Sequence, residues 1–325
     1  MHFFIHFTIA LISLIAIVLS CVLFTNAIEY LGNKLKLGNN ATGSILAVLG
    51  TGLPETIIPL VAIFEVCFSD LKIQTAQDIA LGAVLGSPFM LSTFAMFLLL
   101  IVLLLKKRNS LNVDYNFVLR DYKYFLLAYS CAILFSFKFF VNYKMFLSFV
   151  LILIYGIFVY RTIVKSRVVC IECESEELYF SHGLKLNKNF ILFVQLLLSV
   201  SVLVISSHYF VDEIRHFSTV LNISPSILTL LIAPFATELP ECINSVIWLK
   251  QDKDDLAIAN ILGAIVFQTT ILCAIGMILT PWVLNRVLFI NAILTILCAI
   301  VFLLLVLKNK KITVISLLFC AFAYF

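Results

Sequence analysis

Two short stretches place acidic residues inside otherwise apolar runs. One reads Gly50-Thr-Gly-Leu-Pro-Glu55 and the other reads Ala236-Thr-Glu-Leu-Pro-Glu241, so both contain Thr-x-Leu-Pro-Glu. An ionised side chain at the centre of a bilayer costs about 2.5–3.5 kcal/mol on insertion scales, and such residues are normally functional. The two copies therefore predict a duplicated site with Glu55 and Glu241 as its principal residues.

The residue types in these motifs predict a cation site built from oxygen atoms. Each proline lacks an amide hydrogen and frees the carbonyl four residues earlier. In a membrane such a carbonyl is tolerated where it lines a cavity. Ca²⁺ takes about 6–8 oxygen ligands, with carboxylates neutralising its charge. The predicted ligands are the carboxylates of Glu55, Glu238 and Glu241, the carbonyls of Gly50 and Ala236, and the hydroxyls of Thr51 and Thr237.

Some of these residues have an alternative structural role that does not involve binding a cation. A Pro-Glu pair can kink a helix while its carboxylate pairs with a lysine or with water, although the duplication argues against this for Glu55 and Glu241. Glu238 is either a ligand or a proton carrier beside the ion. Elsewhere, Gln195 predicts a hydrogen bond between helices, and Asn26 is expected at the membrane interface.

The composition excludes a soluble domain. Of the 325 residues, 62% are hydrophobic and 12% are charged, whereas soluble chains are about 45–50% apolar and about 25% charged. The net charge of +4 is small and the basic residues are scattered, so nucleic acid is not an expected partner. No nucleophile–base set or cofactor loop is present, which argues against an enzyme. The stretch 1–20 lacks a basic start and a cleavage site, which predicts a retained helix.

Apolar runs separated by polar breaks predict ten transmembrane helices, since a spanning helix needs about 20 mostly apolar residues. Lysines and arginines concentrate in alternate loops, which predicts that these loops are cytoplasmic and that both termini lie outside. The runs are Phe3–Tyr30, Thr42–Phe68, Ile79–Leu105, Tyr122–Val141, Lys144–Val164, Phe190–Phe210, Ser224–Leu249, Leu256–Thr280, Trp282–Leu307 and Ile312–Phe325.

Five runs precede a polar segment at residues 165–188 and five follow it. Two halves with an odd number of helices are inverted relative to each other, as in many secondary transporters. The predicted fold is therefore an all-α integral membrane protein with two inverted five-helix repeats. The repeats comprise residues 1–164 and 189–325, and residues 165–188 form a cytoplasmic linker.

A second repeated pattern follows each Pro-Glu run. It reads Asp78-Ile-Ala-Leu-Gly-Ala-Val-Leu-Gly86 in the first half and Asp255-Leu-Ala-Ile-Ala-Asn-Ile-Leu-Gly263 in the second. Small residues allow helices to approach each other closely in membranes. The polar residues that follow include Ser87 and Gln268, which we add to the predicted site.

The linker contains Cys170-Ile-Glu-Cys173 beside several glutamates. A CxxC spacing is compatible with a redox or metal role, but there is no second cysteine pair. A plain polar loop is the simpler interpretation.

The Pro-Glu and Gly-containing motifs resemble those of the cation/calcium exchanger superfamily, and most closely its bacterial sodium/calcium exchanger-like membrane proteins. Members carry two inverted repeats, each with a Gly-Thr-Ser-Leu-Pro-Glu helix followed by a Gly-Asn-x-x-Gly-Ser-Asn helix. The resemblance implies that Glu55 and Glu241 are the central calcium ligands, with Thr51 and Thr237 beside them. It also implies a bacterial cytoplasmic membrane as the location.

The chain departs from the family pattern where sodium ligands are expected. Gly52 and Glu238 replace the serine of the first motif, and the Gly-Ser-Asn triplets read Gly86-Ser-Pro and Gly263-Ala-Ile. The added carboxylate of Glu238 instead suits proton coupling, since desolvation and like charge favour protonation of a buried glutamate.

The sequence thus predicts a secondary active antiporter that exchanges Ca²⁺ or a similar divalent cation for Na⁺ or H⁺ by alternating access. Its partners are small inorganic cations and the lipid bilayer, and no permanently bound cofactor is expected. A membrane scaffold or cation sensor with an eroded exchanger site is the alternative. Transport should depend on Glu55, Glu238 and Glu241, whereas a scaffold should not.

Overall fold

The described part of the chain is helical. The structure is a computed structural model that describes residues 2–34, 48–67, 72–137, 139–166, 177–181 and 187–324. Within these ranges the one β-bridge joins Ser110 and Thr313, which confirms the all-α prediction. The α-helices are α1 (His2–Lys34), α3 (Val48–Phe64), α4 (Ile73–Met90), α5 (Met96–Leu105), α6 (Tyr115–Leu134), α7 (Lys144–Ser166), α8 (Lys188–Leu221), α9 (Pro225–Thr237), α10 (Leu239–Lys250), α11 (Asp254–Phe267), α12 (Cys273–Leu279), α13 (Arg286–Asn309) and α14 (Val314–Tyr324).

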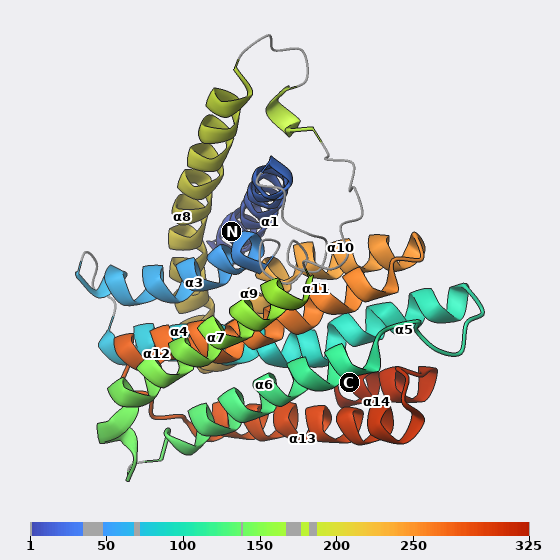
Figure 1. The fold of residues 1–325 in the computed structure, drawn as a ribbon. Helices are drawn as coiled ribbons and strands as arrows, with labels where there is room; N and C mark the ends of the chain where they lie inside the picture. Colours follow the sequence, from blue (N-terminus) through green and yellow to red (C-terminus); the bar gives the residue numbers. More distant parts are fainter. Residues whose placement is uncertain are drawn as a thin grey trace. The chain divides into compact units, whose positions relative to one another are not determined.

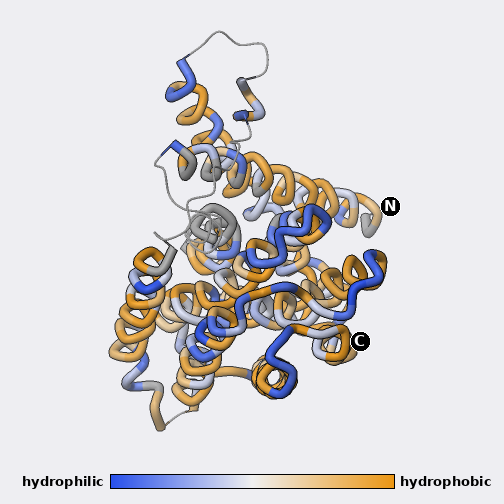
Figure 2. Tube along the Cα trace, turned by 45° about the vertical axis from the view of Figure 1, so that its right-hand side comes forward, coloured by the Kyte–Doolittle hydropathy of each residue, from blue (hydrophilic) through white to orange (hydrophobic). Residues whose placement is uncertain are grey.

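Several of the described helices are long and apolar enough to cross a membrane. Six segments of the described chain meet that criterion by length and composition, and three shorter apolar helices accompany them. Hydrophobic residues run along the helices, and hydrophilic residues gather at their ends and in the connections (Figure 2). A helix satisfies its own backbone hydrogen bonds, which is what an apolar segment requires in lipid.

Several helix boundaries differ from those expected from the sequence, and two of them have a clear local cause. Helix α6 begins at Tyr115 rather than Tyr122, because the carboxylate of Asp114 accepts a hydrogen bond from the Asn116 amide and caps the helix start. Helix α8 continues to Leu221 rather than ending at Phe210. It ends where Asn222 adopts a left-handed conformation with φ 54°, a common way to terminate a helix.

The two Pro-Glu segments have different backbones. The first lies inside α3 (Val48–Phe64), which continues past Glu55 without a break. The second is interrupted, because α9 ends at Thr237 and α10 begins at Leu239. Glu238 lies between them with φ −90° and ψ −8°, and its amide donates to the Pro234 carbonyl at 2.8 Å. Only the second copy therefore forms a discontinuous helix.

Each Gly-containing helix that follows a Pro-Glu segment contains a π-helix. One spans Leu91–Ala95 between α4 and α5, and the other spans Gln268–Leu272 between α11 and α12. Each starts at the same distance from the aligned aspartates, Asp78 and Asp255. π-Helices are rare and often occur at functional sites, so their matching positions extend the internal repeat from sequence to backbone geometry.

The chain divides into two compact units. Unit 1 comprises Met1–Ala83 and Thr162–Pro240, and unit 2 comprises Val84–Arg161 and Glu241–Phe325. Each unit takes one segment from each half of the sequence. The compact units do not coincide with the expected ranges 1–164 and 189–325, and the division into two repeats stays a prediction.

In unit 1, the long helices α1 and α8 run alongside each other (Figure 1), and α3 and α9 pack against both. A buried apolar cluster joins these helices and the start of α4, with Ile58, Ile79, Phe210 and Ala233 among its members. Gly82 allows a close approach of α4 to α9, because a Cβ atom there would lie 2.7 Å from the Ser226 carbonyl oxygen. The expectation that small residues permit close helix packing is confirmed at this position.

Polar side chains also connect α1 with α8 inside unit 1. Gln195 Nε2 donates to the Leu23 carbonyl at 2.8 Å and to Asn26 Oδ1 at 2.9 Å, which confirms the predicted hydrogen bond between helices. Asn26 is buried within unit 1, and its place relative to the membrane interface stays a prediction. Its side-chain oxygen Oδ1 also accepts a hydrogen bond from the Tyr179 backbone amide, and its Nδ2 donates to the Glu177 carbonyl. These bonds hold the short 177–181 segment against α1.

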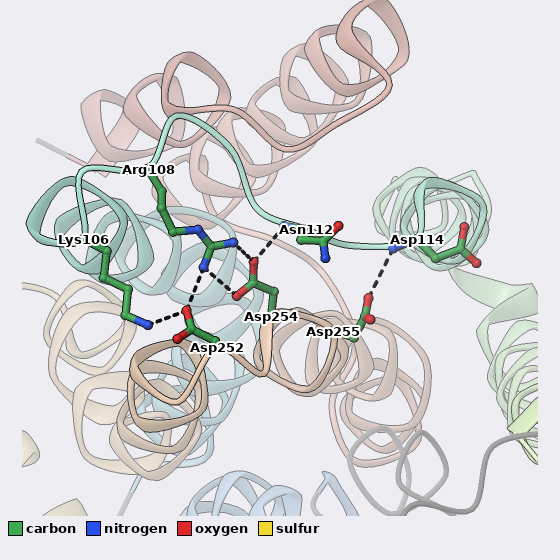
Figure 3. A network of polar contacts seen from close by, with 7 residues as sticks. All are labelled: Lys106, Arg108, Asn112, Asp114, Asp252, Asp254 and Asp255. Atoms are coloured by element: carbon green, nitrogen blue, oxygen red, sulfur yellow. Dashed lines mark hydrogen bonds and ion pairs between the residues drawn. The ribbon is translucent and has the colours of Figure 1, made fainter.

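In unit 2, α6 packs against α11 and α13, and α14 packs against α5 and α13. A charged network joins the connection between α5 and α6 to the start of α11 (Figure 3). Arg108 makes a two-pronged ion pair with Asp254, and the Asn112 amide donates to the same carboxylate at 2.7 Å. Lys106 and Arg108 also contact the exposed Asp252.

The aligned Asp255 belongs to this network. Its carboxylate accepts a hydrogen bond from the Asp114 amide at 3.2 Å (Figure 3). Acidic residues in the first turn of α11 also interact favourably with the helix dipole. The aspartate that begins the second repeated pattern therefore has a structural role at a helix end, outside the predicted cation site.

We predict that Gly82→Ala destabilises the protein by about 1–3 kcal/mol, because the new methyl group collides with the backbone of α9. Gly156 is the matched control, because a Cβ atom there meets nothing within 4 Å. Gly156→Ala should stabilise α7 by up to about 1 kcal/mol through helix propensity. Thermal unfolding in detergent measures both changes, and equal shifts in the two variants would contradict the close packing.

Asp254→Asn should lower the free energy of unfolding by about 1.5–3 kcal/mol, because it removes the charge from hydrogen bonds made by Arg108 and the Asn112 amide. Asp252→Asn provides the comparison on the same connection. Its carboxylate is 71% exposed, so the exposed pair adds little and the unfolding temperature should barely change. A larger effect at Asp252 than at Asp254 would refute this ranking.

Candidate cation site

Two of the predicted glutamates come together in unit 1. Glu55 lies on α3 and Glu238 at the end of α9, and both side chains are buried. One carboxylate oxygen of each lies within 4.8 Å of the other. Burying two like charges this close is costly unless a cation or a proton compensates them. The pair therefore has the chemistry of a cation or proton site.

The backbone break explains why Glu238 reaches this position. Helix α9 starts at Pro225, which suits the first turn of a helix because its missing amide hydrogen is not needed there. The helix ends at Thr237, whose hydroxyl donates to the Ala233 carbonyl at 3.3 Å. The chain then turns at Glu238 before α10 begins, so Thr237 and Glu238 both lie buried beside the break.

Glu241 is the first residue of the second segment of unit 2. It lies in the first turn of α10 and is fully buried, where the helix dipole favours a negative charge. The Asn260 amide of α11 donates to the Glu241 carbonyl at 3.1 Å and to Ser245 Oγ at 3.0 Å. These bonds fix the first turn of α10 against α11 and so position the Glu241 backbone.

Chain continuity links Glu241 to the pair in unit 1. Glu238 precedes it by three positions, and three residues span at most about 10 Å. The order Glu-Leu-Pro-Glu therefore keeps the backbones that carry the two carboxylates within that distance.

Ser87 and Gln268, the other two predicted residues, are buried in unit 2. Ser87 lies on α4 directly before Pro88, and Gln268 begins the second π-helix. The neighbouring Asn291 of α13 donates to the Leu85 carbonyl at 3.0 Å, which anchors α4 close to its proline. Polar groups thus lie within the most buried parts of both Gly-containing helices.

Some of the predicted ligands lie outside what the structure describes in detail. The backbones of Gly50, Thr51 and Ala236 are helical, but their environment is not part of the described structure, so their roles stay predictions. Cys170 and Cys173 fall in the segment 167–176, which lies outside the described residues.

Asn260 is a candidate site residue that the sequence patterns did not single out. Its side-chain oxygen Oδ1 is buried without a hydrogen-bond partner in the described structure, while its amide nitrogen makes the two bonds described above. A signal was present in the sequence, because Asn260 occupies the Asn position of the Ala-Asn-Ile-Leu-Gly263 pattern. The corresponding position in the first half is Ala83, so the asparagine is not repeated there. Glu55 and Glu241 were found because their motif occurs in both halves.

The described helices, with buried carboxylates among apolar residues, define an integral membrane protein. A family model described as sodium/calcium exchanger protein matches residues 5–164 and 191–325. These segments make up most of the sequence, and the chain belongs to the sodium/calcium exchanger family. It is accordingly a membrane protein of a cation antiporter family and not an enzyme.

Solved structures share the fold at low sequence identity. The crystal structure of the H⁺/Ca²⁺ exchanger CAX is 18% identical, with a TM-score of 0.79 over 98% of this chain and 80% of that chain. The sodium–calcium exchanger NCX_Mj is also 18% identical, with a TM-score of 0.63 over 99% of this chain and 97% of that chain. Both similarities concern the fold alone.

One curated relative matches over a short segment. CaxA of Alkalimonas amylolytica, a protein named as an antiporter, is 30% identical over 92 residues. The match covers 28% of this chain and 29% of that protein, so it spans less than a third of the relative.

Asn260→Ala should destabilise the protein by about 1–3 kcal/mol, because it leaves the Ser245 hydroxyl and the Glu241 carbonyl without their buried donor. It should also weaken Ca²⁺ binding, since the first turn of α10 loses its anchor. Asn244→Ala, on the partly exposed face of the same helix, should change neither property. Thermal unfolding and ⁴⁵Ca²⁺ binding in detergent measure the two effects, and identical behaviour of both variants would count against the positioning role.

Proposed function

We propose that this protein is a secondary active antiporter that exchanges Ca²⁺, or a similar divalent cation, for protons. The observation that carries this proposal is the buried pair formed by Glu55 and Glu238, whose carboxylate oxygens lie within 4.8 Å of each other. A divalent cation neutralises two carboxylates at once and accepts several more oxygen ligands. Family membership supports cation antiport as the general activity.

Glu55, Glu238 and Glu241 supply the carboxylates of the proposed transport site. The first two already lie close together in unit 1, and the chain connection keeps Glu241 near Glu238. The hydroxyls of Thr51 and Thr237 and the carbonyls of Gly50 and Ala236 complete an oxygen environment. Ser87 and Gln268 contribute polar groups from the π-containing helices.

Protons are the proposed coupling ion because of the third carboxylate. When the divalent ion leaves, buried carboxylates at this spacing repel each other, and binding of protons removes the repulsion. The replacement of the expected serines by Gly52 and Glu238 removes hydroxyl groups and adds a group that carries a proton. The fold is also similar to that of the H⁺/Ca²⁺ exchanger CAX.

The proposed architecture has ten transmembrane helices in two inverted five-helix repeats, with both termini outside a bacterial cytoplasmic membrane. Support comes from the repeated Pro-Glu segments, the matching π-helices and the two separate family matches. Inverted repeats commonly move relative to each other to alternate access to a central site. Glu238 lies at a helix break, and a broken helix can adjust its backbone when an ion binds.

Glu55→Gln and Glu241→Gln should each reduce Ca²⁺ uptake at least about 100-fold, because each removes a negative charge from the cation site and leaves the ion's charge incompletely neutralised. Glu238→Gln should retain measurable Ca²⁺ binding but lose uptake driven by a proton gradient. Proteoliposomes with separately imposed H⁺ and Na⁺ gradients, assayed with ⁴⁵Ca²⁺ and a panel of other cations, measure these effects.

The exposed Glu177 provides the matched control, because Glu177→Gln removes a carboxylate of unit 1 that lies outside the cluster. Uptake that follows a sodium gradient and ignores a proton gradient would reject proton coupling. Uptake unchanged in all three site variants would reject transport by this site and favour a scaffold or sensor.

A further inference from the structure

A second polar cluster lies at one end of unit 1, away from the proposed transport site. Glu65 follows the end of α3 and contacts His208 of α8 through Oε1 and Nδ1. The other ring nitrogen of His208, Nε2, lies 4.0 Å from Asp212 Oδ2 one turn further along α8. One ligand atom from each of the three residues lies within 4.8 Å of the others.

This cluster is separate from the transport site along the same helix. Glu65 follows Glu55 by ten positions, and a helix rises about 1.5 Å per residue, so about 15 Å of helix axis separates them. The cluster is also partly open, because His208 is 49% and Asp212 is 45% exposed, whereas Glu65 is 5% exposed. The protein therefore does not enclose the cluster completely, and the buried carboxylate of Glu65 lies at its base.

The surrounding charges favour a cation. Glu65 and Asp212 supply two carboxylates, and Arg215 is a positive side chain near Glu65. Glu65 is buried at the base of the cluster, and its carboxylate lies close to that of Asp212. A cation bound to the cluster would offset both the burial and the repulsion from Asp212.

Two further histidines, His6 and His216, make contacts near the C-terminal end of α8, where His208 and Asp212 lie. His6 of α1 bonds to Glu213 with Nδ1 3.0 Å from Oε2. His216 of α8 stacks on the His6 ring at a centroid distance of 3.6 Å. These contacts hold the start of α1 against α8 beside the cluster, so the backbone carrying His208 and Asp212 is fixed by tertiary packing.

The donor set distinguishes this cluster from a calcium site. Ca²⁺ prefers oxygen ligands only, whereas an imidazole with two carboxylates suits zinc and related transition metals. Around a tetrahedral zinc ion, ligand atoms lie about 3.3 Å apart. The half-exposed His208 and Asp212 side chains can contract the observed spacing to that value by rotation, and water can fill the remaining position.

We propose that Glu65, His208 and Asp212 form a binding site for a transition-metal ion of the zinc class. The bound ion joins the end of α3, the helix that carries Glu55, to α8. The site is distinct from the cargo site in place and in donor chemistry, and its occupation does not depend on the proposed transport reaction.

Zinc titration of the full-length protein in detergent tests this site. Isothermal titration calorimetry with ZnCl₂ should detect one site whose affinity falls at least tenfold in His208→Ala and in Asp212→Asn. Both side chains are about half exposed, so the variants should fold, and their unfolding temperatures without metal check this. Zinc K-edge absorption of the loaded protein should show one imidazole among oxygen ligands.

Glu177→Gln serves as the matched control and should bind Zn²⁺ like the parent protein. Binding of Ca²⁺, titrated separately as CaCl₂, should change less than twofold in His208→Ala. Zinc affinity that is unchanged in His208→Ala and Asp212→Asn would overturn the proposal. Loss of the zinc site in Glu55→Gln, with retention in His208→Ala, would equally overturn it, because the ion would then occupy the cargo site.

Discussion

The dominant physical constraint is the burial of carboxylates in an apolar helical protein. Glu55, Glu238 and Glu241 are all at most 3% exposed. Buried charges are costly unless ions, protons or hydrogen bonds compensate them. The surrounding structure maintains this arrangement with a broken helix at Glu238 and a hydrogen-bonded first turn of α10. In the proposed function, the exchanged cation or proton compensates the buried negative charge.

Charged residues at several helix ends of the described chain are compensated within the protein. The Arg108–Asp254 pair and its neighbours fix helix ends in unit 2, and the His6–Glu213 pair does so in unit 1. The contrast separates two uses of charge in a membrane protein. Paired charges at helix ends stabilise the fold, whereas like charges brought together between helices suit the binding of a cation or a proton.

Much of the fold followed from sequence patterns. Long apolar runs predicted the helices, because lipid requires segments that satisfy their own backbone hydrogen bonds. The boundaries were less predictable. The apolar run Phe190–Phe210 predicted a helix that ends at Phe210, yet α8 continues to Leu221. Glu213 pairs with His6 of α1, and His208 pairs with Glu65 at the end of α3, so tertiary contacts accommodate charged residues in this part of the helix. Asp255 stood out in the sequence as part of a repeat, and the structure shows it bonded to the Asp114 amide.

The sequence by itself determined the family, the membrane class and the candidate carboxylates, because these depend on residue type and on spacing along one chain. Only the tertiary structure decided which side chains meet. It brought Glu55 to Glu238 from helices far apart in the sequence, placed Asn260 on the backbone of Glu241, and joined Glu65 to His208. Such contacts depend on how helices pack, and packing is set by the combined shapes of many side chains rather than by any local pattern.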